Sequence, residues 1–285
     1  MDLCDLRTIR DLLSRHGFHF SKSMGQNFLI DASVPQDIAC ASGADESCGV
    51  LEIGPGIGPL TVQLSRLAGR VVAVELDRTL LPVLEETLSG CENVEVISGD
   101  VMKLDLTALA AEKFPSLTPL VCANLPYNIT TPVLTALVEA GCFASITVMI
   151  QREVARRICA APGTADYGAF SVFMQYHTEP ELLFDVPPAC FHPAPKVTSS
   201  VLRCRLRQVP PVETADPSFF FRVVRASFAL RRKTLLNSLS SALGGFDKEL
   251  LRQALEACGL PADIRGERLG LREFAALSNW LYAKR

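Results

Sequence analysis

Short apolar segments alternate with segments of helical periodicity through the first half of the chain. The apolar segments have the length of strands, and they span residues 50–53, 71–76, 94–98, 119–124 and 146–150. Strands that alternate with helices form parallel sheets, because a parallel connection needs a long crossover and the crossover helices cover both faces. A strand buried on both faces is mainly apolar, as these segments are. The alternation therefore predicts an α/β fold with a mostly parallel sheet.

The ends of this region look different from its centre. Residues 1–20 have helical periodicity, and we interpret them as an N-terminal helical extension. Two strand-like segments at 181–186 and 199–207 flank a Pro-rich segment. A short return of this kind joins antiparallel rather than parallel strands, so we predict an antiparallel pair at one edge of the sheet.

A polar, Pro-rich segment at 209–217 marks the predicted domain boundary. Asp216 followed by Pro217 is a favourable helix start, because Asp caps the first turn and Pro suits the first helical position. Helical patterns then continue to the C-terminus. We therefore predict a first domain of residues 1–209 and a small all-helical domain of residues 210–285.

The composition narrows the class of protein. Hydrophobic residues make up 48% of the 285 residues, enough to build a core. The N-terminus lacks an apolar signal core and the longest apolar runs are too short to cross a bilayer, so we expect a cytoplasmic protein outside membranes. Ten cysteines without a C-x-x-C pair, with 4 histidines, favour reduced thiols over a metal site. At a net charge of −3, any binding of nucleic acid must rest on a local basic surface.

A glycine-rich segment at 52–58, EIGPGIG, follows the first strand of the sheet and opens a helix. Glycines there allow a ligand to approach the backbone at the carboxyl end of the strands. Pro59 stands where the dinucleotide fingerprint needs Gly or Ala, which disfavours NAD. Glu75 ends the second strand, where it can bind ribose hydroxyls, and Asp100 ends the third, where it can accept from an adenine amino group. This layout is typical of Rossmann-like methyltransferases that use S-adenosylmethionine, although a plain turn with solvated acids is the alternative.

The tetrapeptide Asn124-Leu125-Pro126-Tyr127 follows the fourth strand and suits methylation of an exocyclic amine. The N6 nitrogen of adenine is a poor nucleophile, so catalysis depends on positioning it and localising its lone pair. The Asn124 side-chain oxygen and a main-chain carbonyl, for which we choose Leu125, can accept both N6 hydrogens. Pro126 stiffens the turn, and Tyr127 offers a ring for stacking on the base. Alone, such a turn is weak evidence, because Asn-x-Pro-Tyr also occurs by chance.

Seven segments together resemble the ordered motifs of the ribosomal RNA adenine N6,N6-dimethyltransferases. They are KSMGQNFL (22–29), EIGPGIGPLT (52–61), VELD (74–77), NLPYNITTPVL (124–134), YGAFSV (167–172), FHPAPKVTSSV (191–201) and FALRRKTLLNSL (228–239). The likeness is greatest to the branch that acts on the small ribosomal subunit. It implies dimethylation of two adjacent adenosines in a hairpin loop near the 3′ end of 16S rRNA, late in subunit assembly.

The resemblance also implies roles for individual residues. Cofactor-binding positions would be Asn27, Leu29, Gly54, Gly56, Glu75, Asp100 and Asn124. Phe191 would face Tyr127 across a base flipped into the site, although a core aromatic is the alternative for Phe191. Phe191 and the four residues of the tetrapeptide would together form the catalytic site.

A run of basic residues near the C-terminus is the candidate contact with RNA phosphates. In an apolar helical context without acids lie Arg222, Arg225, Arg231, Arg232 and Lys233. Basic residues on one side of helices are the expected footprint of backbone binding, although such runs are more often solvated faces. We expect the partner to be a precursor of the small subunit and the chain to act as a monomer.

Three other functions remain open from the sequence. An erythromycin-resistance type of enzyme, which dimethylates large-subunit rRNA, shares the fold, but the segments at 191–197 and 228–239 favour the small-subunit branch. An NAD-binding oxidoreductase is disfavoured by Pro59 and by the turn after the fourth strand. A non-catalytic assembly factor is the third, and the presence of Asn124 and Tyr127 argues for activity.

Overall fold

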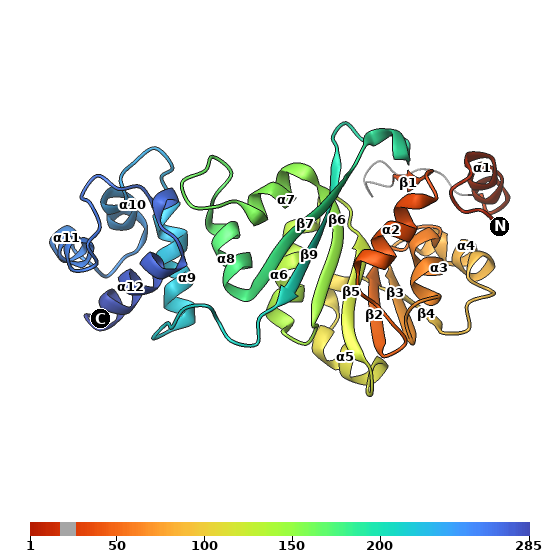
Figure 1. Ribbon diagram of the computed structural model, residues 1–285, viewed down its shortest axis with the longest axis horizontal. Helices are drawn as coiled ribbons and strands as arrows, with labels where there is room; N and C mark the ends of the chain where they lie inside the picture. Colours follow the sequence, from red (N-terminus) through yellow and green to blue (C-terminus); the bar gives the residue numbers. More distant parts are fainter. Residues whose placement is uncertain (18–26) are drawn as a thin grey trace. The chain divides into compact units, whose positions relative to one another are not determined.

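The computed structural model describes residues 1–17 and 27–285, which form two compact units (Figure 1). The first, which we call the sheet unit, comprises Met1–Ala155 and Glu179–Leu206. The second, the helical unit, comprises Arg156–Thr178 and Arg207–Arg285. The chain leaves the sheet unit for the last time after Leu206, close to the predicted boundary at residue 209. The assignment of residues 156–178 to the helical unit differs from the prediction.

The sheet unit is built on seven strands in the order β4-β3-β2-β5-β6-β9-β7. Their bounds are β2 Cys48–Ile53, β3 Arg70–Glu75, β4 Val94–Ser98, β5 Thr118–Asn124, β6 Ser145–Gln151, β7 Thr178–Val186 and β9 Ser199–Leu206. The pairs formed by β2 to β6 are all parallel, and β9 pairs antiparallel with β6. The predicted α/β fold is thereby confirmed, with the change of direction at the predicted edge.

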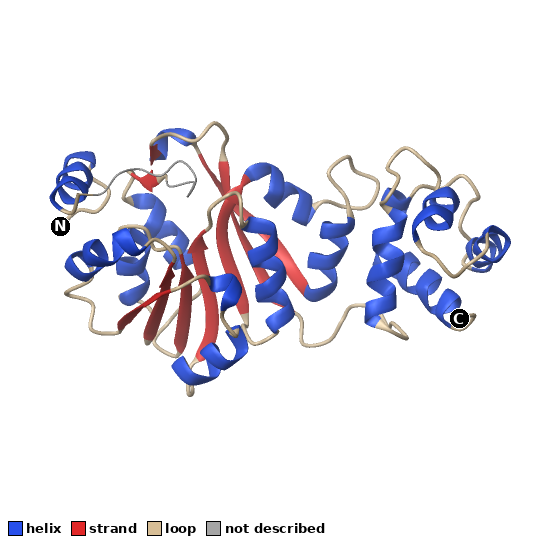
Figure 2. Cartoon of the chain, turned by 180° about the vertical axis from the view of Figure 1, so that it is seen from behind, coloured by secondary structure: helices blue, strands red, loops and turns tan. Residues whose placement is uncertain are grey.

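Helices cover both faces of this sheet (Figures 1 and 2). They are α2 Ser33–Ala41, α3 Pro59–Ser65, α4 Leu81–Thr87, α5 Leu106–Lys113, α6 Thr130–Ala140 and the start of α7 Arg152–Cys159. Ile38 of α2 and Leu64 of α3 pack with Val50 and Cys122 of the sheet in one apolar core. All six residues of β2 are buried, which explains why this strand carries no polar face except for its one acid.

The N-terminal extension forms one helix, α1 Leu6–Arg15, capped by Asp5, whose side chain accepts from the amide of Thr8. The buried residues of this helix are Ile9, Leu12 and Leu13. They pack in one cluster with Phe28, Ile57, Leu80 and Val83. Arg15 and His16 both contact Glu86, at 2.8 and 2.7 Å. The helix therefore docks beside the glycine loop. Residues 22–26 of the predicted KSMGQNFL motif lie outside the described residues.

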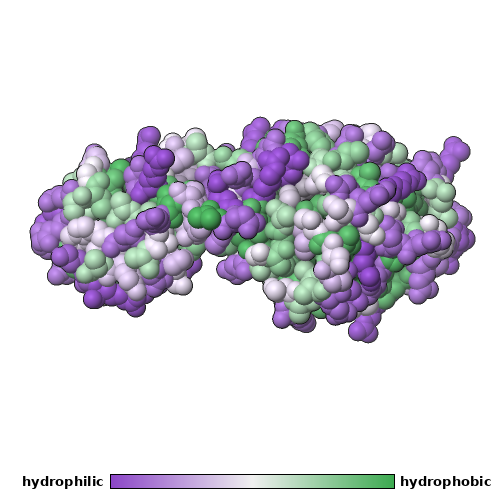
Figure 3. Space-filling view, turned by 60° about the horizontal axis from the view of Figure 1, so that its bottom comes forward, coloured by the Kyte–Doolittle hydropathy of each residue, from purple (hydrophilic) through white to green (hydrophobic). Residues whose placement is uncertain are grey.

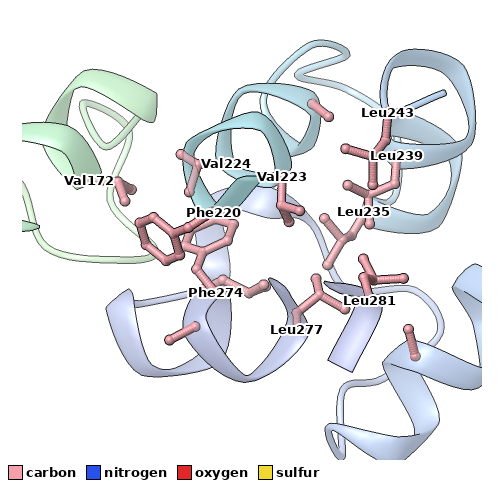
Figure 4. Close-up of a cluster of buried hydrophobic side chains, with 14 of the residues drawn as sticks. Val172, Phe220, Val223, Val224, Leu235, Leu239, Leu243, Phe274, Leu277 and Leu281 are labelled. Carbon is pink, nitrogen blue, oxygen red and sulfur yellow. The ribbon is translucent and has the colours of Figure 1, made fainter. Parts of the chain in front are cut away.

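The helical unit has its own apolar core, in which side chains from successive helices converge (Figure 4). Its helices are α8 Ala169–His177, α9 Pro217–Ser227, α10 Leu235–Ala242, α11 Lys248–Ala257 and α12 Leu271–Tyr282. Asp216 caps α9 by accepting from the amide of Phe219, as predicted from the Asp-Pro pair. Val172 and Tyr176 of α8 are buried in the same core as Phe220, which is why residues 156–178 belong here. The sequence pattern of residues 156–178 predicts an apolar helix face, but it does not predict which of the two cores buries that face.

Polar and apolar side chains are interspersed over the surface of both units on the face shown in Figure 3. Within the described residues no helix is both long and apolar enough to cross a bilayer. Across residues 1–17 and 27–285, no cluster of three or more His, Cys, Asp or Glu side chains is placed to hold a metal ion.

Candidate active site

The carboxyl ends of the parallel strands open into one cavity of the sheet unit. Four strands contribute residues at or just after their carboxyl ends. These residues are Ile53 to Gly56, Glu75 to Asp77, Gly99 to Val101, and Asn124 to Ile129. Asn27, Phe28, Leu29 and Phe191 close another side. Every predicted cofactor-binding and catalytic residue therefore lies in this one cavity. The arrangement arises because parallel strands end at the same edge of the sheet.

The glycine loop leaves β2 in a backbone conformation that side chains disfavour. Gly54 and Gly56 have φ values of +68° and +62°. The Gly54 amide donates to the carbonyl of Val74, which holds the loop against β3. The ring of Phe28 lies 3.5 Å from where a Cβ on Gly56 would stand. The loop is thus a smooth backbone surface against which a ligand can lie closely.

Glu75 presents a fixed carboxylate to the cavity. Its side chain is buried, and its Oε1 accepts from the amide of Asp77 at 2.8 Å while Oε2 accepts from the amide of Gly56 at 3.4 Å. Burial raises the pKa of this carboxyl, and the two amide donors oppose that rise. Each oxygen retains a second lone pair, so the group can accept two hydroxyl donors side by side.

Asp100 follows the neighbouring strand β4, which ends at Ser98, and caps the turn Val101–Lys103. Its Oδ1 accepts from the Met102 amide at 3.0 Å, and Lys103 lies 3.8 Å from Oδ2. Leu76, with 53% of its surface exposed, and the buried Val101 also line the cavity. An acceptor beside two apolar side chains is suited to an adenine ring. Leu76 was not predicted because it closes an apolar run and was assigned to the strand, and Val101 was not predicted because it is a single apolar residue in the turn after Asp100.

The turn after β5 is held rigidly to the sheet. Asn124 pairs with Met149 of β6, and the Leu125 amide donates to the Met149 carbonyl at 3.1 Å. The Pro126 carbonyl accepts from the Ile129 amide and from the Thr130 hydroxyl, each at 3.2 Å. Because these bonds already engage the Pro126 carbonyl, the Leu125 carbonyl stays the candidate for a ligand contact.

Two aromatic residues line the cavity next to this turn. Tyr127 is half-buried, its hydroxyl lies 2.7 Å from Ser199 Oγ, and burial raises its pKa. Phe191 is 3% exposed and belongs to β8 Phe191–His192, which pairs antiparallel with β1 Phe28–Leu29. The side chain is thus buried, as the core alternative required, and also faces the cavity, as the functional prediction required.

Glu52 is a second buried acid in the cavity wall, and we predicted no role for it beyond membership of the glycine-loop motif. It is 1% exposed, and its Oε2 has no hydrogen-bond partner among the described residues. Burial raises the pKa of this carboxyl to about 8, the neighbouring Thr61 opposes the shift, and the charge of Glu75 adds to it. The sequence signal was an acid inside an otherwise apolar strand.

The five basic residues predicted to bind RNA belong to the helical unit and are all exposed. Arg222 and Arg225 lie on α9, as expected. The other three correct the prediction, because they lie in the connection between α9 and α10 rather than on a helix. Thr234 explains the break, since its side chain caps α10 by accepting from the Asn237 amide. Arg231 donates to the Ala165 carbonyl at 2.8 Å, which anchors one end of this connection.

Comparison with known proteins places the chain among RNA methyltransferases. Residues 17–258 match the model of a family described as ribosomal RNA adenine dimethylase. A Ribosomal RNA small subunit methyltransferase A from Geobacillus thermodenitrificans is 49% identical over 276 residues, covering 95% of this chain and 94% of that protein. The protein of the same name from Alkaliphilus oremlandii is 45% identical, with 96% of each chain covered.

Solved structures agree with the fold. The 23S rRNA methyltransferase ErmE is 28% identical with a TM-score of 0.69, over 90% of this chain and 100% of that one. A dimethyladenosine transferase from Plasmodium falciparum, 24% identical, superimposes with a TM-score of 0.74 over 87% of this chain and 95% of that one. The family match extends over most of the chain and over every strand of the sheet. This chain belongs to the ribosomal RNA adenine dimethylase family.

Proposed function

We propose that the chain transfers two methyl groups from S-adenosylmethionine to the N6 of each of two adjacent adenosines in a hairpin loop near the 3′ end of 16S rRNA, late in small-subunit assembly. The observation that carries the proposal is that Asn124 lies in the same cavity as Gly54, Glu75 and Asp100. The names of the similar proteins, Ribosomal RNA small subunit methyltransferase A, support the choice of subunit.

The cavity residues fit the methyl donor. Glu75 would accept hydrogen bonds from the ribose hydroxyls, and Asp100 from the adenine amino group beside Leu76 and Val101. Gly54 and Gly56 would lie against the methionine part, because their bare backbone leaves room for it. Asn27 and Leu29 would close over the donor. When bound, S-adenosylmethionine supplies an electrophilic methyl group on a sulfonium that is a good leaving group.

The residues of the turn would prepare the target amine. The Asn124 side-chain oxygen and the Leu125 carbonyl would accept the two N6 hydrogens, which favours a pyramidal nitrogen with its lone pair free. Pro126 keeps the turn rigid, and Tyr127 and Phe191 would stack on the two faces of the flipped base. Transfer forms the nitrogen–carbon bond as the sulfur–carbon bond of the donor breaks, and the amine loses a proton to solvent. A second round on the same nitrogen gives the dimethyl product.

Mass spectrometry of rRNA nucleosides tests the proposal directly. Immature small subunits are incubated with the protein and isotopically labelled donor, and N6,N6-dimethyladenosine is the expected product. The second candidate is a large-subunit enzyme, which the likeness to ErmE favours. Protein-free large-subunit RNA in a parallel reaction distinguishes the two, because methylation of that RNA alone would contradict the small-subunit proposal.

Replacing Glu75 by Gln should weaken binding of S-adenosylhomocysteine by about 10- to 100-fold, because hydrogen bonds to a charged group contribute roughly 1.5–3 kcal/mol. Isothermal titration calorimetry measures the effect. Glu95→Gln is the matched control, since Glu95 lies on β4 but is paired with Arg70 and Lys113 instead of lining the cavity. NAD included as a second titrant tests the oxidoreductase alternative: binding of NAD without S-adenosylhomocysteine would exclude the methyltransferase.

The basic surface gives a second prediction in the helical unit. Changing Arg231, Arg232 and Lys233 together to Gln should weaken RNA binding and flatten its salt dependence, by up to about 0.7–0.9 in the log–log slope for each lost phosphate contact. Filter binding at several salt concentrations measures both. Arg252→Gln is the control, because this arginine of α11 is paired with Glu249 in the same helix. An unchanged slope in the triple variant would mean that these residues are only solvated.

We further infer that the chain acts as a monomer in the cytoplasm. The lining of the proposed site comes from the sheet unit of a single chain, so a second copy is not needed to complete it. The ten cysteines include no C-x-x-C pair, and scattered thiols of this kind are typical of a reducing compartment. Light scattering should give the mass of one chain, 31.0 kDa.

A further inference from the structure

The hydroxyl of Tyr127 is hydrogen-bonded to a residue that does not line the cavity. Ser199 begins β9, lies opposite Gln151 of β6, and is fully buried. Its Oγ is 2.7 Å from the Tyr127 hydroxyl. Ser199 is not among the residues that line the cavity. The contact therefore joins a wall of the cavity to the interior of the sheet.

This bond restricts the orientation of the Tyr127 ring. A tyrosine side chain has two free torsions, and a ring attached only at its Cβ can rotate about both. Here the backbone is fixed by the turn bonds to Met149 and the far end of the ring is fixed by Ser199. Because the hydroxyl oxygen lies on the extension of the Cβ–Cγ bond, holding both ends fixes the direction of the ring axis and therefore the side-chain rotamer.

The opposite wall is fixed by backbone pairing. Phe191 pairs with Leu29, and the amide of Ile30 donates to the carbonyl of Cys190 at 2.8 Å. Phe191 and Ser199 are the two ends of one short segment, 191–199. That segment therefore supplies one aromatic wall and orients the other.

We propose that Ser199 is a positioning residue that fixes where the Tyr127 ring lies, so that the ring is in place for stacking on the target adenine. The inference rests on the proposed function, in which the base lies between Tyr127 and Phe191. The contribution is preorganisation: the ring is already oriented before RNA binds, and the base amine is brought to the donor methyl group in one geometry. Because Ser199 acts through the ring, its loss should affect the RNA substrate and leave donor binding intact.

Two single variants and their combination test this. Ser199→Ala and Tyr127→Phe each remove the bond and keep the ring. Each should lower kcat for small-subunit RNA by about tenfold, the rate equivalent of one hydrogen bond. The Kd of S-adenosylhomocysteine should change by less than about twofold in both. The double variant should be no slower than the slower single variant, because both changes break the same contact.

A neighbouring serine provides the matched control. Ser200 is also buried on β9, but its hydroxyl donates to Asp185. Ser200→Ala should lower the melting temperature and leave kcat unchanged. The RNA with 2-aminopurine in place of the target adenine adds a direct readout: stacking quenches its fluorescence, and Ser199→Ala should reduce the quenching.

The outcomes separate this inference from the proposed function. If the unmodified protein does not methylate small-subunit RNA, the proposed function fails, and the inference fails with it. If it is active and Ser199→Ala retains normal kcat and normal quenching, the inference is wrong. It is equally wrong if donor affinity falls in parallel with kcat, or if the two single effects multiply in the double variant.

Discussion

Asn124→Ala should slow methyl transfer to adenosine by about 10²- to 10³-fold, the usual effect of removing one preorganised polar group that acts in a transition state. The remaining acceptor, the Leu125 carbonyl, can bind only one of the two N6 hydrogens. The other hydrogen then keeps the nitrogen planar and its lone pair delocalised. The measurement is single-turnover methylation of immature small subunits with labelled donor.

Binding measurements decide whether this loss belongs to the chemical step. Small-subunit affinity should be unchanged, because the proposed phosphate contacts lie in the helical unit and Asn124 lies in the sheet unit. Asn124→Asp is the informative partner, since it retains an acceptor oxygen in the same place and should keep more activity than the alanine variant. Near-normal turnover in Asn124→Ala would refute the role given to this amide.

The cavity could be predicted from the sequence because a parallel sheet gathers its strand ends. Glu75, Asp100 and Asn124 are far apart in the chain, yet each lies at or just after the end of a mainly apolar strand. Once the strands are placed, their ends must meet at one edge, and the residues that follow must line the same cavity. Asn27 and Phe191 came only from resemblance: Asn27 precedes the two-residue strand β1 and Phe191 lies on the two-residue strand β8, and strands this short have no periodicity to detect.

Contacts between side chains distant in sequence were not predictable in this way. The bond between Tyr127 and Ser199 depends on the register of β9 against β6, and strand patterns leave that register open. The assignment of residues 156–178 to the helical unit depends on which core buries Tyr176. The expectation that Arg231 would be helical was wrong, because Thr234 caps a new helix, α10, and Arg231 lies in the connection before that cap. A cap of this kind outweighs apolar periodicity that continues across the break.

Glu52→Gln should make the protein more stable in alkaline solution, and the sign follows from the two pKa values. The carboxyl has a pKa of about 8 in the folded chain and 4.5 in the reference state. Between these values the folded chain holds more protons than the unfolded chain, so stability falls as pH rises through the window. The slope reaches about 1.4 kcal/mol per pH unit, and the loss across the window is on the order of a few kcal/mol.

The comparison of the two proteins isolates this one group. Glu75 also has a raised pKa and contributes in the same direction; it is retained in the variant, so only its interaction with the charge of Glu52 enters the difference. Glu86, whose pKa is lowered to about 2 by its bonds to Arg15 and His16, stabilises the fold above 4.5 and loses that effect only in acid. Urea unfolding at pH 5 and pH 8.5 should therefore give similar stabilities for the two proteins in acid and a clear advantage for Glu52→Gln in base. Equal pH dependence in both would mean that Glu52 is ionised in the folded protein, with water or a cation beside its Oε2.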